Sequence, residues 1–215
     1  MNPNALHKGA DMARIEEIMT LAPVIPVLVI HDPAYARPVA EALVAGGLRA
    51  LEVTLRTDCA LEVIAEMAKV EGAVVGAGTV LNGDDLKRSV DAGARFIVSP
   101  GLTTGVAQAA QASNVPLLPG TANASDIMRG LDLGLTHFKF FPATAAGGIP
   151  ALKALSAPFG QARFCPTGGI KAETAADWLG LPSVLCVGGS WLVPAGAPDV
   201  AAITARARQA AALKV

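Results

Sequence analysis

The chain has 215 residues, which suits one domain with a sizeable core or one barrel of modest size. Its formal net charge of −1 provides no field that would attract nucleic acid or a membrane surface. Only 16% of the residues are charged and 52% are apolar, so we expect identical subunits to cover part of the surface. The three cysteines form no CxxC motif, and no histidine stands at ligand spacing, which argues against a disulfide framework or a metal site.

The N-terminal stretch contains no apolar signal core, and no apolar run reaches the length of a membrane span. These observations predict a soluble, cytoplasmic protein with no membrane partner. Residues 1–11 are interpreted as a flexible tail. The apolar spacing that follows predicts an extra N-terminal helix near 12–21.

The rest of the chain alternates strand-like runs, short turns and Ala-rich amphipathic helices. Strands are predicted at 24–30, 49–55, 73–78, 94–98, 115–118, 136–141, 162–166 and 184–188. Helices are predicted at 33–45, 59–70, 83–92, 103–113, 124–133, 148–157, 172–179 and 198–213. The short connections fit compact βα units, and the absence of a linker predicts one domain over residues 1–215.

This alternation fits either a closed (β/α)₈ TIM barrel or an open doubly wound sheet. In an open sheet a few strands supply the site, whereas in a barrel the C-terminal ends of many strands converge. Nearly every predicted strand ends in a reactive or small residue, which favours the barrel. These ends are Arg56, Thr79, Ser99-Pro100, Pro119-Gly120, Lys139, Thr167-Gly168-Gly169 and Gly188-Gly189-Ser190. The run Gly76-Ala77-Gly78 lacks the third glycine of a dinucleotide fingerprint and is interpreted as a strand-end turn.

Lys139 lies in a predicted strand that is otherwise almost entirely apolar, from Leu135 to Pro142. Alternation along the strand directs Phe138 and Phe140 towards the helices and Lys139 into the barrel. Burial removes hydration from the ammonium group, so a neutral amine becomes accessible that can attack a carbonyl and form a Schiff base. The alternative is a lysine at a strand end whose side chain reaches to water.

A second polar cluster lies on the predicted strand 49–55, where Glu52, Thr54 and Arg56 share the face that points into the barrel. We interpret Glu52 as a proton-transfer group and Arg56 as the ligand of a substrate carboxylate, which a guanidinium binds with two hydrogen bonds. The alternative is a structural Glu52–Arg56 ion pair. Thr79 could bind a small carboxylate or could instead cap the next helix.

Two Gly-Gly pairs follow the last two predicted strands, one next to Thr167 and one next to Ser190. Glycines let backbone N–H groups approach an anion, and a phosphate often lies between these two loops in (β/α)₈ enzymes. The alternative is that both pairs are only tight turns. We interpret His31 and His137 as structural or surface groups. Packing is the predicted role of Trp178, Trp191, Cys165 and Cys186.

Six runs together resemble the class I aldolase family that acts on 2-dehydro-3-deoxy-6-phosphogluconate (KDPG) and 4-hydroxy-2-oxoglutarate (KHG). They are Leu51-Glu-Val-Thr-Leu-Arg-Thr57, Val75-Gly-Ala-Gly-Thr-Val-Leu-Asn82, Ser99-Pro-Gly-Leu102, Phe138-Lys-Phe-Phe-Pro-Ala143, Phe164-Cys-Pro-Thr-Gly-Gly-Ile170 and Val187-Gly-Gly-Ser-Trp-Leu192. The resemblance spans residues 12 to 213. It implies a trimeric barrel, without metal or cofactor, that cleaves KDPG to pyruvate and D-glyceraldehyde 3-phosphate in the Entner–Doudoroff pathway.

The resemblance also implies roles for individual residues. Lys139 resembles the Schiff-base lysine and Glu52 the general acid and base. The implied substrate-binding residues are Arg56 and Thr79 for the carboxylate, Pro100 and Phe141 in the pocket wall, and Thr167, Gly168, Gly169, Gly189 and Ser190 for the distal part and its phosphate. The segment Thr121–Asp126 departs from the family's usual Thr-rich turn, and we expect Asn123 or Ser125 to cap the next helix.

Three alternative functions remain open at this point. The same chemistry could act on 4-hydroxy-2-oxoglutarate, which has no phosphate, or on the C4-epimeric 2-dehydro-3-deoxy-6-phosphogalactonate. A third alternative is a non-catalytic barrel that binds a phosphosugar as a sensor.

Overall fold

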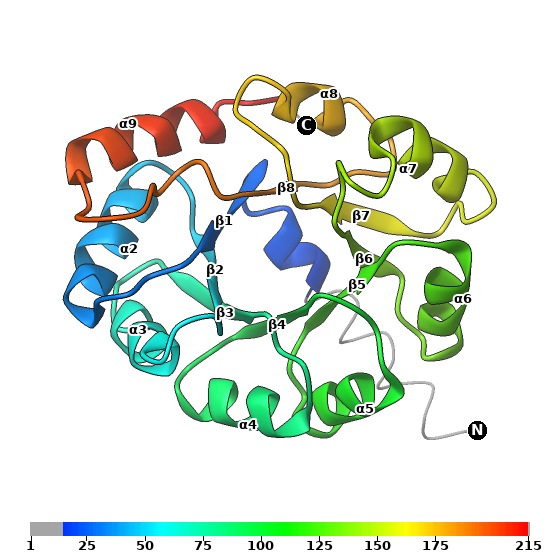
Figure 1. The fold of residues 1–215 in the computed structure, drawn as a ribbon, viewed down its shortest axis with the longest axis horizontal. Coiled ribbons are helices and arrows are strands. Elements are labelled where there is room, and N and C mark those ends of the chain that lie inside the picture. Colours follow the sequence, from blue (N-terminus) through cyan, green and yellow to red (C-terminus); the bar gives the residue numbers. More distant parts are fainter. Residues whose placement is uncertain (1–14, 215) are drawn as a thin grey trace.

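The protein is a ring of eight strands surrounded by helices, seen along its axis in Figure 1. This computed structural model describes residues 15–214. The strands are β1 (Val24–Leu28), β2 (Ala50–Thr54), β3 (Val74–Gly78), β4 (Phe96–Ser99), β5 (Leu117–Thr121), β6 (His137–Phe140), β7 (Arg163–Pro166) and β8 (Val187–Gly189). The helices are η1 (Pro33–Tyr35), α2 (Ala36–Ala45), α3 (Ala60–Met67), α4 (Gly83–Asp91), α5 (Thr104–Ala112), α6 (Ala124–Asp132), α7 (Gly148–Ser156), α8 (Ala175–Leu179) and α9 (Val200–Ala211).

The strands are parallel and form a single sheet in the order β7-β6-β5-β4-β3-β2-β1-β8. Isolated bridges from Phe164 to Val184 and from Thr167 to Gly188 join the two ends of that order. The sheet therefore closes on itself. This confirms the (β/α)₈ barrel and excludes the open doubly wound sheet, which would leave two free edges.

The observed elements agree with the predicted ones to within a few residues at most ends. The largest differences are three residues, at the starts of β8 and α8 and at the ends of β5 and α3. β8 is predicted from Val184 but begins at Val187, because Val184 makes only an isolated bridge. The predicted N-terminal helix is confirmed over residues 15–19. The remainder of that helix before residue 15, and the predicted tail at 1–11, lie outside the described residues.

Two apolar layers account for the packing of the barrel. The larger layer lies between sheet and helices and contains Phe138, Phe140 and Phe164, each fully buried. At about 25 cal/mol per Å² of apolar surface, a buried side chain of this size contributes roughly 1.5–3 kcal/mol. The smaller layer fills the barrel interior, where Phe96 and Val98 meet the apolar side of the N-terminal helix.

The N-terminal helix closes the end of the barrel at which the strands begin. Ile15, Ile18 and Met19 belong to the interior apolar layer, and Figure 1 shows this blue segment inside the ring of strands. Glu16 Oε2 lies 3.8 Å from Nε2 of His137, the first residue of β6. The helix therefore covers the interior apolar layer at the end where the strands begin.

Local hydrogen bonds fix where several outer helices begin. The side chains of Asn82, Thr103, Asn123 and Asp199 each accept a bond from the backbone N–H three residues later. Such a cap typically contributes about 1 kcal/mol. The prediction that Asn123 or Ser125 caps α6 is confirmed for Asn123, whose Oδ1 lies 3.0 Å from the N of Asp126.

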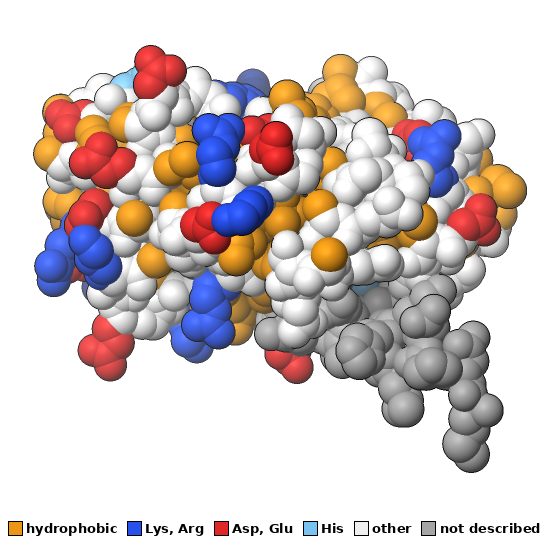
Figure 2. Space-filling model, turned by 90° about the horizontal axis from the view of Figure 1, so that it is seen from below, with side chains coloured by type: hydrophobic (Ala, Val, Ile, Leu, Met, Phe, Trp, Pro, Cys, Tyr) orange, Lys and Arg blue, Asp and Glu red, His pale blue; other side chains and the backbone are white. Residues whose placement is uncertain are grey.

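Charges of both signs are interspersed on the face shown in Figure 2, with apolar side chains between them. Ion pairs within single helices also join opposite charges, such as Lys87 with Asp91 at 2.6 Å. This face therefore carries no extended field of one sign. Among the helices of the described residues, none is both long enough and apolar enough to span a bilayer.

Candidate active site

Lys139 and Glu52 form a buried ion pair inside the barrel. Lys139 lies in β6 and Glu52 in β2, and Lys139 Nζ donates to Glu52 Oε1 across 2.9 Å. Only 6% and 4% of their side chains are exposed. Each charge offsets part of the desolvation cost of the other. The prediction of a buried lysine is confirmed, and the alternative of a lysine that reaches to water is wrong.

Alternation along β6 directs Lys139 inward. Its neighbours Phe138 and Phe140 are buried in the layer between sheet and helices, where the Phe140 ring centroid lies 6.4 Å from that of Trp178. Phe141 follows the strand and is half-buried, with its ring centroid 5.4 Å from Lys139 Nζ. The predicted arrangement of this strand and the packing role of Trp178 are both confirmed.

Alternation along β2 places Glu52 and Thr54 on one face, but Arg56 differs from the prediction. Thr54 is buried and its hydroxyl donates to the carbonyl oxygen of Leu28 across 2.9 Å. Arg56 is exposed, because β2 ends at Thr54 and Arg56 lies in the turn that follows, where its N donates to Thr54 O across 2.8 Å. The alternative of a structural Glu52–Arg56 ion pair is also wrong, since the carboxylate pairs with Lys139.

Arg56 instead meets Thr79 at the rim of the barrel. Its Nε donates to Thr79 Oγ1 across 3.2 Å, and no ion pair among residues 15–214 includes Arg56. Thr79 has a left-handed backbone with φ of 60°. Non-glycine residues seldom adopt this conformation, and it often accompanies functional sites. The alternative that Thr79 caps the next helix is wrong, because Asn82 caps α4.

Pro100 lies against the residue that pairs with Lys139 on the neighbouring strand. It follows β4 and is half-buried. A Cβ on Gly120 would overlap the carbonyl group of Pro100, and Gly120 is the strand partner of Lys139. The structure thus brings Pro100 to the same part of the barrel as the amine.

The loop after β7 presents two successive glycines with left-handed backbones, Gly168 with φ of 104° and Gly169 with φ of 78°. Its carbonyls are held by the loop after β6, since Ala143 N donates to Thr167 O across 2.8 Å and Thr144 N to Gly168 O across 3.0 Å. The loop is therefore anchored beside the strand that carries Lys139.

The loop after β8 lies next to it. Thr167 bridges Gly188, and a Cβ on Gly188 would overlap the Thr167 hydroxyl. Gly189 is buried and Ser190 is exposed directly after it. The predicted distal residues from the two loops thus lie at one side of the barrel mouth.

Cys165 and Cys186 are buried core residues, as predicted. Their two thiol side chains also interact with each other. The contact with Cys165 raises the pKa of the Cys186 thiol well above its ordinary value, and burial and the Glu52 carboxylate add to the increase. Because Cys165 is the strand partner of Lys139, the thiol pair lies beside the ion pair. The places of the two cysteines on successive predicted strands could have indicated this contact.

His137 is buried, whereas His31 is exposed. Burial lowers the pKa of His137, the Glu16 carboxylate opposes this, and Arg163 adds to it. His137 occurs two positions before Lys139, so it faces the interior from the opposite end of the barrel. The contact with Glu16 was not predicted, because it joins two elements that are distant in sequence.

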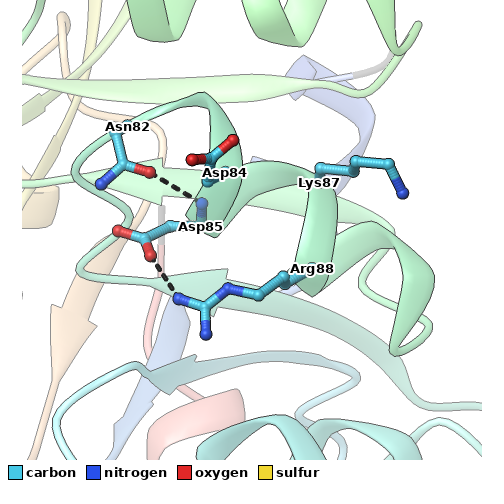
Figure 3. A pocket seen from close by; sticks show the side chains of 5 residues that line it. All are labelled: Asn82, Asp84, Asp85, Lys87 and Arg88. Carbon is cyan, nitrogen blue, oxygen red and sulfur yellow. Dashed lines mark hydrogen bonds and ion pairs between the residues drawn. The ribbon is translucent and has the colours of Figure 1, made fainter.

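One surface pocket lies apart from these residues, at the start of α4. It is lined by Asn82, Asp84, Asp85, Lys87 and Arg88, which Figure 3 shows from close by. Asp85 accepts from Arg88 Nη2 across 2.7 Å, and its backbone N–H donates to Asn82. The hydrogen bonds among Asn82, Asp85 and Arg88 are thus those of a capped helix N-terminus. The pocket includes none of the predicted site residues.

The arrangement supplies what imine chemistry needs. An amine that already contacts a carboxylate can transfer its proton and attack a carbonyl carbon. The adjacent Arg56–Thr79 pair has donors free for a small carboxylate. Within residues 15–214, no group of three His, Cys, Asp or Glu side chains is arranged to hold a metal ion.

Comparisons with known proteins agree with this geometry. The family model described as KDPG and KHG aldolase matches residues 15–206. The 2-dehydro-3-deoxy-phosphogluconate aldolase of Zymomonas mobilis is 62% identical over 203 residues, covering 94% of this chain and 98% of the relative. A crystal structure of that organism's 2-keto-3-deoxy-6-phosphogluconate aldolase with 3-phosphoglycerate superimposes with a TM-score of 0.93, covering 94% and 97% of the two chains at 62% identity.

A third relative is a crystal structure of KDPG aldolase from Legionella pneumophila, with pyruvate captured as a covalent carbinolamine intermediate. It is 46% identical, has a TM-score of 0.89, and the match covers 92% of this chain and 98% of that one. The family model spans most of the chain, and the relatives match it over nearly their whole length. The chain therefore belongs to the KDPG and KHG aldolase family.

Proposed function

We propose that this protein is a class I aldolase that cleaves 2-dehydro-3-deoxy-6-phosphogluconate to pyruvate and D-glyceraldehyde 3-phosphate. The observation that carries the proposal is the buried contact of 2.9 Å between Lys139 Nζ and Glu52 Oε1. Family membership supports the same chemistry. The relatives from Z. mobilis and L. pneumophila support the substrate and the covalent intermediate by their names and bound molecules.

The reaction begins when Lys139 transfers a proton to Glu52 and attacks the C2 ketone. Arg56 and Thr79 hold the substrate carboxylate, while Pro100 and Phe141 line the pocket around C2. Glu52 returns its proton to the carbinolamine hydroxyl, which leaves as water, so the adduct becomes a protonated imine and Glu52 is again a carboxylate. The imine can accept the electron pair of the neighbouring C3–C4 bond.

Glu52 then removes the proton of the C4 hydroxyl, directly or through a water molecule. The C3–C4 bond breaks, glyceraldehyde 3-phosphate leaves as the aldehyde, and the electron pair of the broken bond forms an enamine on the pyruvyl fragment. Thr167, Gly168, Gly169, Gly189 and Ser190 bind the departing phosphate end. Protonation at C3 and hydrolysis of the imine release pyruvate and restore the amine of Lys139.

The main alternative is cleavage of 4-hydroxy-2-oxoglutarate, which the description of the matching family also names. A coupled assay of pyruvate release separates the candidates when it compares KDPG, its C4 epimer and 4-hydroxy-2-oxoglutarate. We expect the highest kcat/KM with KDPG. A higher value for either competitor would reassign the substrate, and binding of KDPG without turnover would favour a sensor.

The proposal includes the organisation of the protein in the cell. One domain spans residues 1–215, and a homotrimer in the cytoplasm is the expected working form. The low content of charged residues, 16%, supports coverage of part of the surface by identical subunits. Light scattering of the purified protein tests the trimer.

A further inference from the structure

Gly78, the last residue of β3, lies directly against the carboxylate of Glu52. A Cβ at this position would overlap Glu52 Oε1 and would lie 2.7 Å from its Cγ and 2.9 Å from its Cδ. Real Cβ atoms essentially never approach heavy atoms so closely. Oε1 is also the atom that accepts from Lys139 Nζ. The Glu52 carboxylate therefore occupies the space that a side chain at position 78 would need.

The backbone at Gly78 has little freedom to move aside. Gly78 is the strand partner of Thr54, and Leu55 N donates to Gly78 O across 2.8 Å. On the other side, Val80 N donates to Val98 O across 3.2 Å. Hydrogen bonds thus hold this end of β3 to both of its neighbours, so an added methyl group must displace the Glu52 side chain.

Conformational freedom of the backbone does not explain the glycine. Gly78 is absent from the glycines with positive φ, whereas Thr79 beside it has the left-handed backbone. An alanine could therefore adopt the backbone of Gly78 without strain. The requirement for glycine here comes from the volume that Glu52 occupies.

We propose that Gly78 is a positioning residue, which fixes the Glu52 carboxylate against the Lys139 amine by having no side chain. This inference rests on the proposed function for its effect on catalysis. Misplacement of a catalytic group by about 1 Å can cost on the order of 10²-fold in rate. Gly78→Ala should therefore lower kcat by about 10-fold to 10²-fold while it leaves the KM for KDPG nearly unchanged, because Arg56 and Thr79 still bind the carboxylate.

A double-mutant cycle separates positioning from a merely structural role. Glu52→Gln keeps the shape of the side chain but removes its basicity. If Gly78 acts through Glu52, Gly78→Ala has little further effect on kcat in the Glu52→Gln background. Equal fold-losses in the two backgrounds would overturn the proposal, as would a wild-type kcat and pH profile in Gly78→Ala.

Thermal unfolding tests the contact without any reference to activity. Gly78→Ala should lower the Tm, and the loss should be smaller in the Glu52→Ala background, where the space is free. An equal loss in both backgrounds would overturn the steric argument. The control is Gly46→Ala, whose Cβ would overlap the side chain of Ala207 at the contact of α2 with α9. The Tm loss from this control substitution should be the same in the wild-type and Glu52→Ala backgrounds.

The two claims fail in different ways. If the wild-type protein does not cleave KDPG, the proposed function fails, but the Tm cycle still reports whether Gly78 accommodates Glu52. If the wild-type protein is active and the cycles are additive, only the role of Gly78 fails.

Discussion

The Lys139 ammonium lies 2.9 Å from the Glu52 carboxylate, although 87 positions separate the two residues in the chain. Removal of one partner would leave the other as an uncompensated buried charge, which typically costs about 3–5 kcal/mol. Variants of this pair therefore affect stability and chemistry together, so a measurement of Tm should accompany each activity assay on them.

Lys139→Ala should abolish pyruvate release, since no other amine contacts this carboxylate among the described ion pairs. Borohydride reduction in the presence of pyruvate, followed by mass spectrometry, should place an adduct on Lys139 in the wild type and none in the variant. Lys153→Ala, at an exposed position on α7, serves as the control and should retain the adduct. An adduct on a different lysine would contradict the assignment.

Glu52→Gln should lower kcat by about 10²–10⁴-fold, the usual contribution of general acid–base catalysis. Its loss should be smaller than that of Lys139→Ala, because the imine carries the larger share of the rate enhancement. Single-turnover kinetics with borohydride trapping should still detect an adduct with pyruvate. A kcat within a factor of a few of the wild type would exclude Glu52 as the proton-transfer group.

Arg56→Ala should raise the KM for pyruvyl substrates more than it lowers kcat, since a charge-assisted hydrogen bond contributes about 1.5–3 kcal/mol. The corresponding loss in kcat/KM is roughly 10-fold to 10²-fold. Thr79→Ser keeps the hydroxyl that accepts from Arg56 Nε and should retain most activity, whereas Thr79→Ala should not. Equal activity of these two Thr79 variants would show that the hydroxyl has no part in binding.

The loops after β7 and β8 should make the enzyme prefer phosphorylated substrates. Ser190→Ala should lower kcat/KM for KDPG but leave the value for 4-hydroxy-2-oxoglutarate nearly unchanged, because only KDPG has a phosphate to contact the exposed hydroxyl. Steady-state kinetics with both substrates provides the measurement. Equal losses for the two substrates would indicate that these Gly-Gly loops are only turns.

His137 should make folding stability depend on pH. Burial lowers its pKa, with Glu16 opposing and Arg163 adding to the shift. The unfolded chain therefore binds this proton at a higher pH than the folded chain does. The stability tied to neutral His137 is complete above about pH 6.5 and is lost as the pH falls through the folded-state pKa.

His137→Gln should therefore flatten the decline of the unfolding free energy below about pH 6.5. Urea denaturation across this range measures the effect, and His31→Gln at an exposed position provides the control. A variant as pH-dependent as the wild type would contradict the role of His137.

Local patterns in the sequence determined much of the fold and the direction of the key side chains. The alternation of Phe138, Lys139 and Phe140 is a property of a few consecutive residues, and it correctly directs the amine inward. The spacing of apolar residues predicted the eight strand–helix units in the same way, because each spacing repeats within one strand or one helix. The family motifs were also readable from the chain alone.

Only the tertiary structure decided which groups meet. The sequence allowed Glu52 to pair with Arg56 on its own strand, but barrel closure brings Lys139 to it from β6 and leaves Arg56 at the rim with Thr79. The space at Gly78 and the Glu16–His137 contact arise in the same way. Such contacts depend on strand register and on the closure of the sheet, which are set by the packing of the whole barrel and not by any short run of residues.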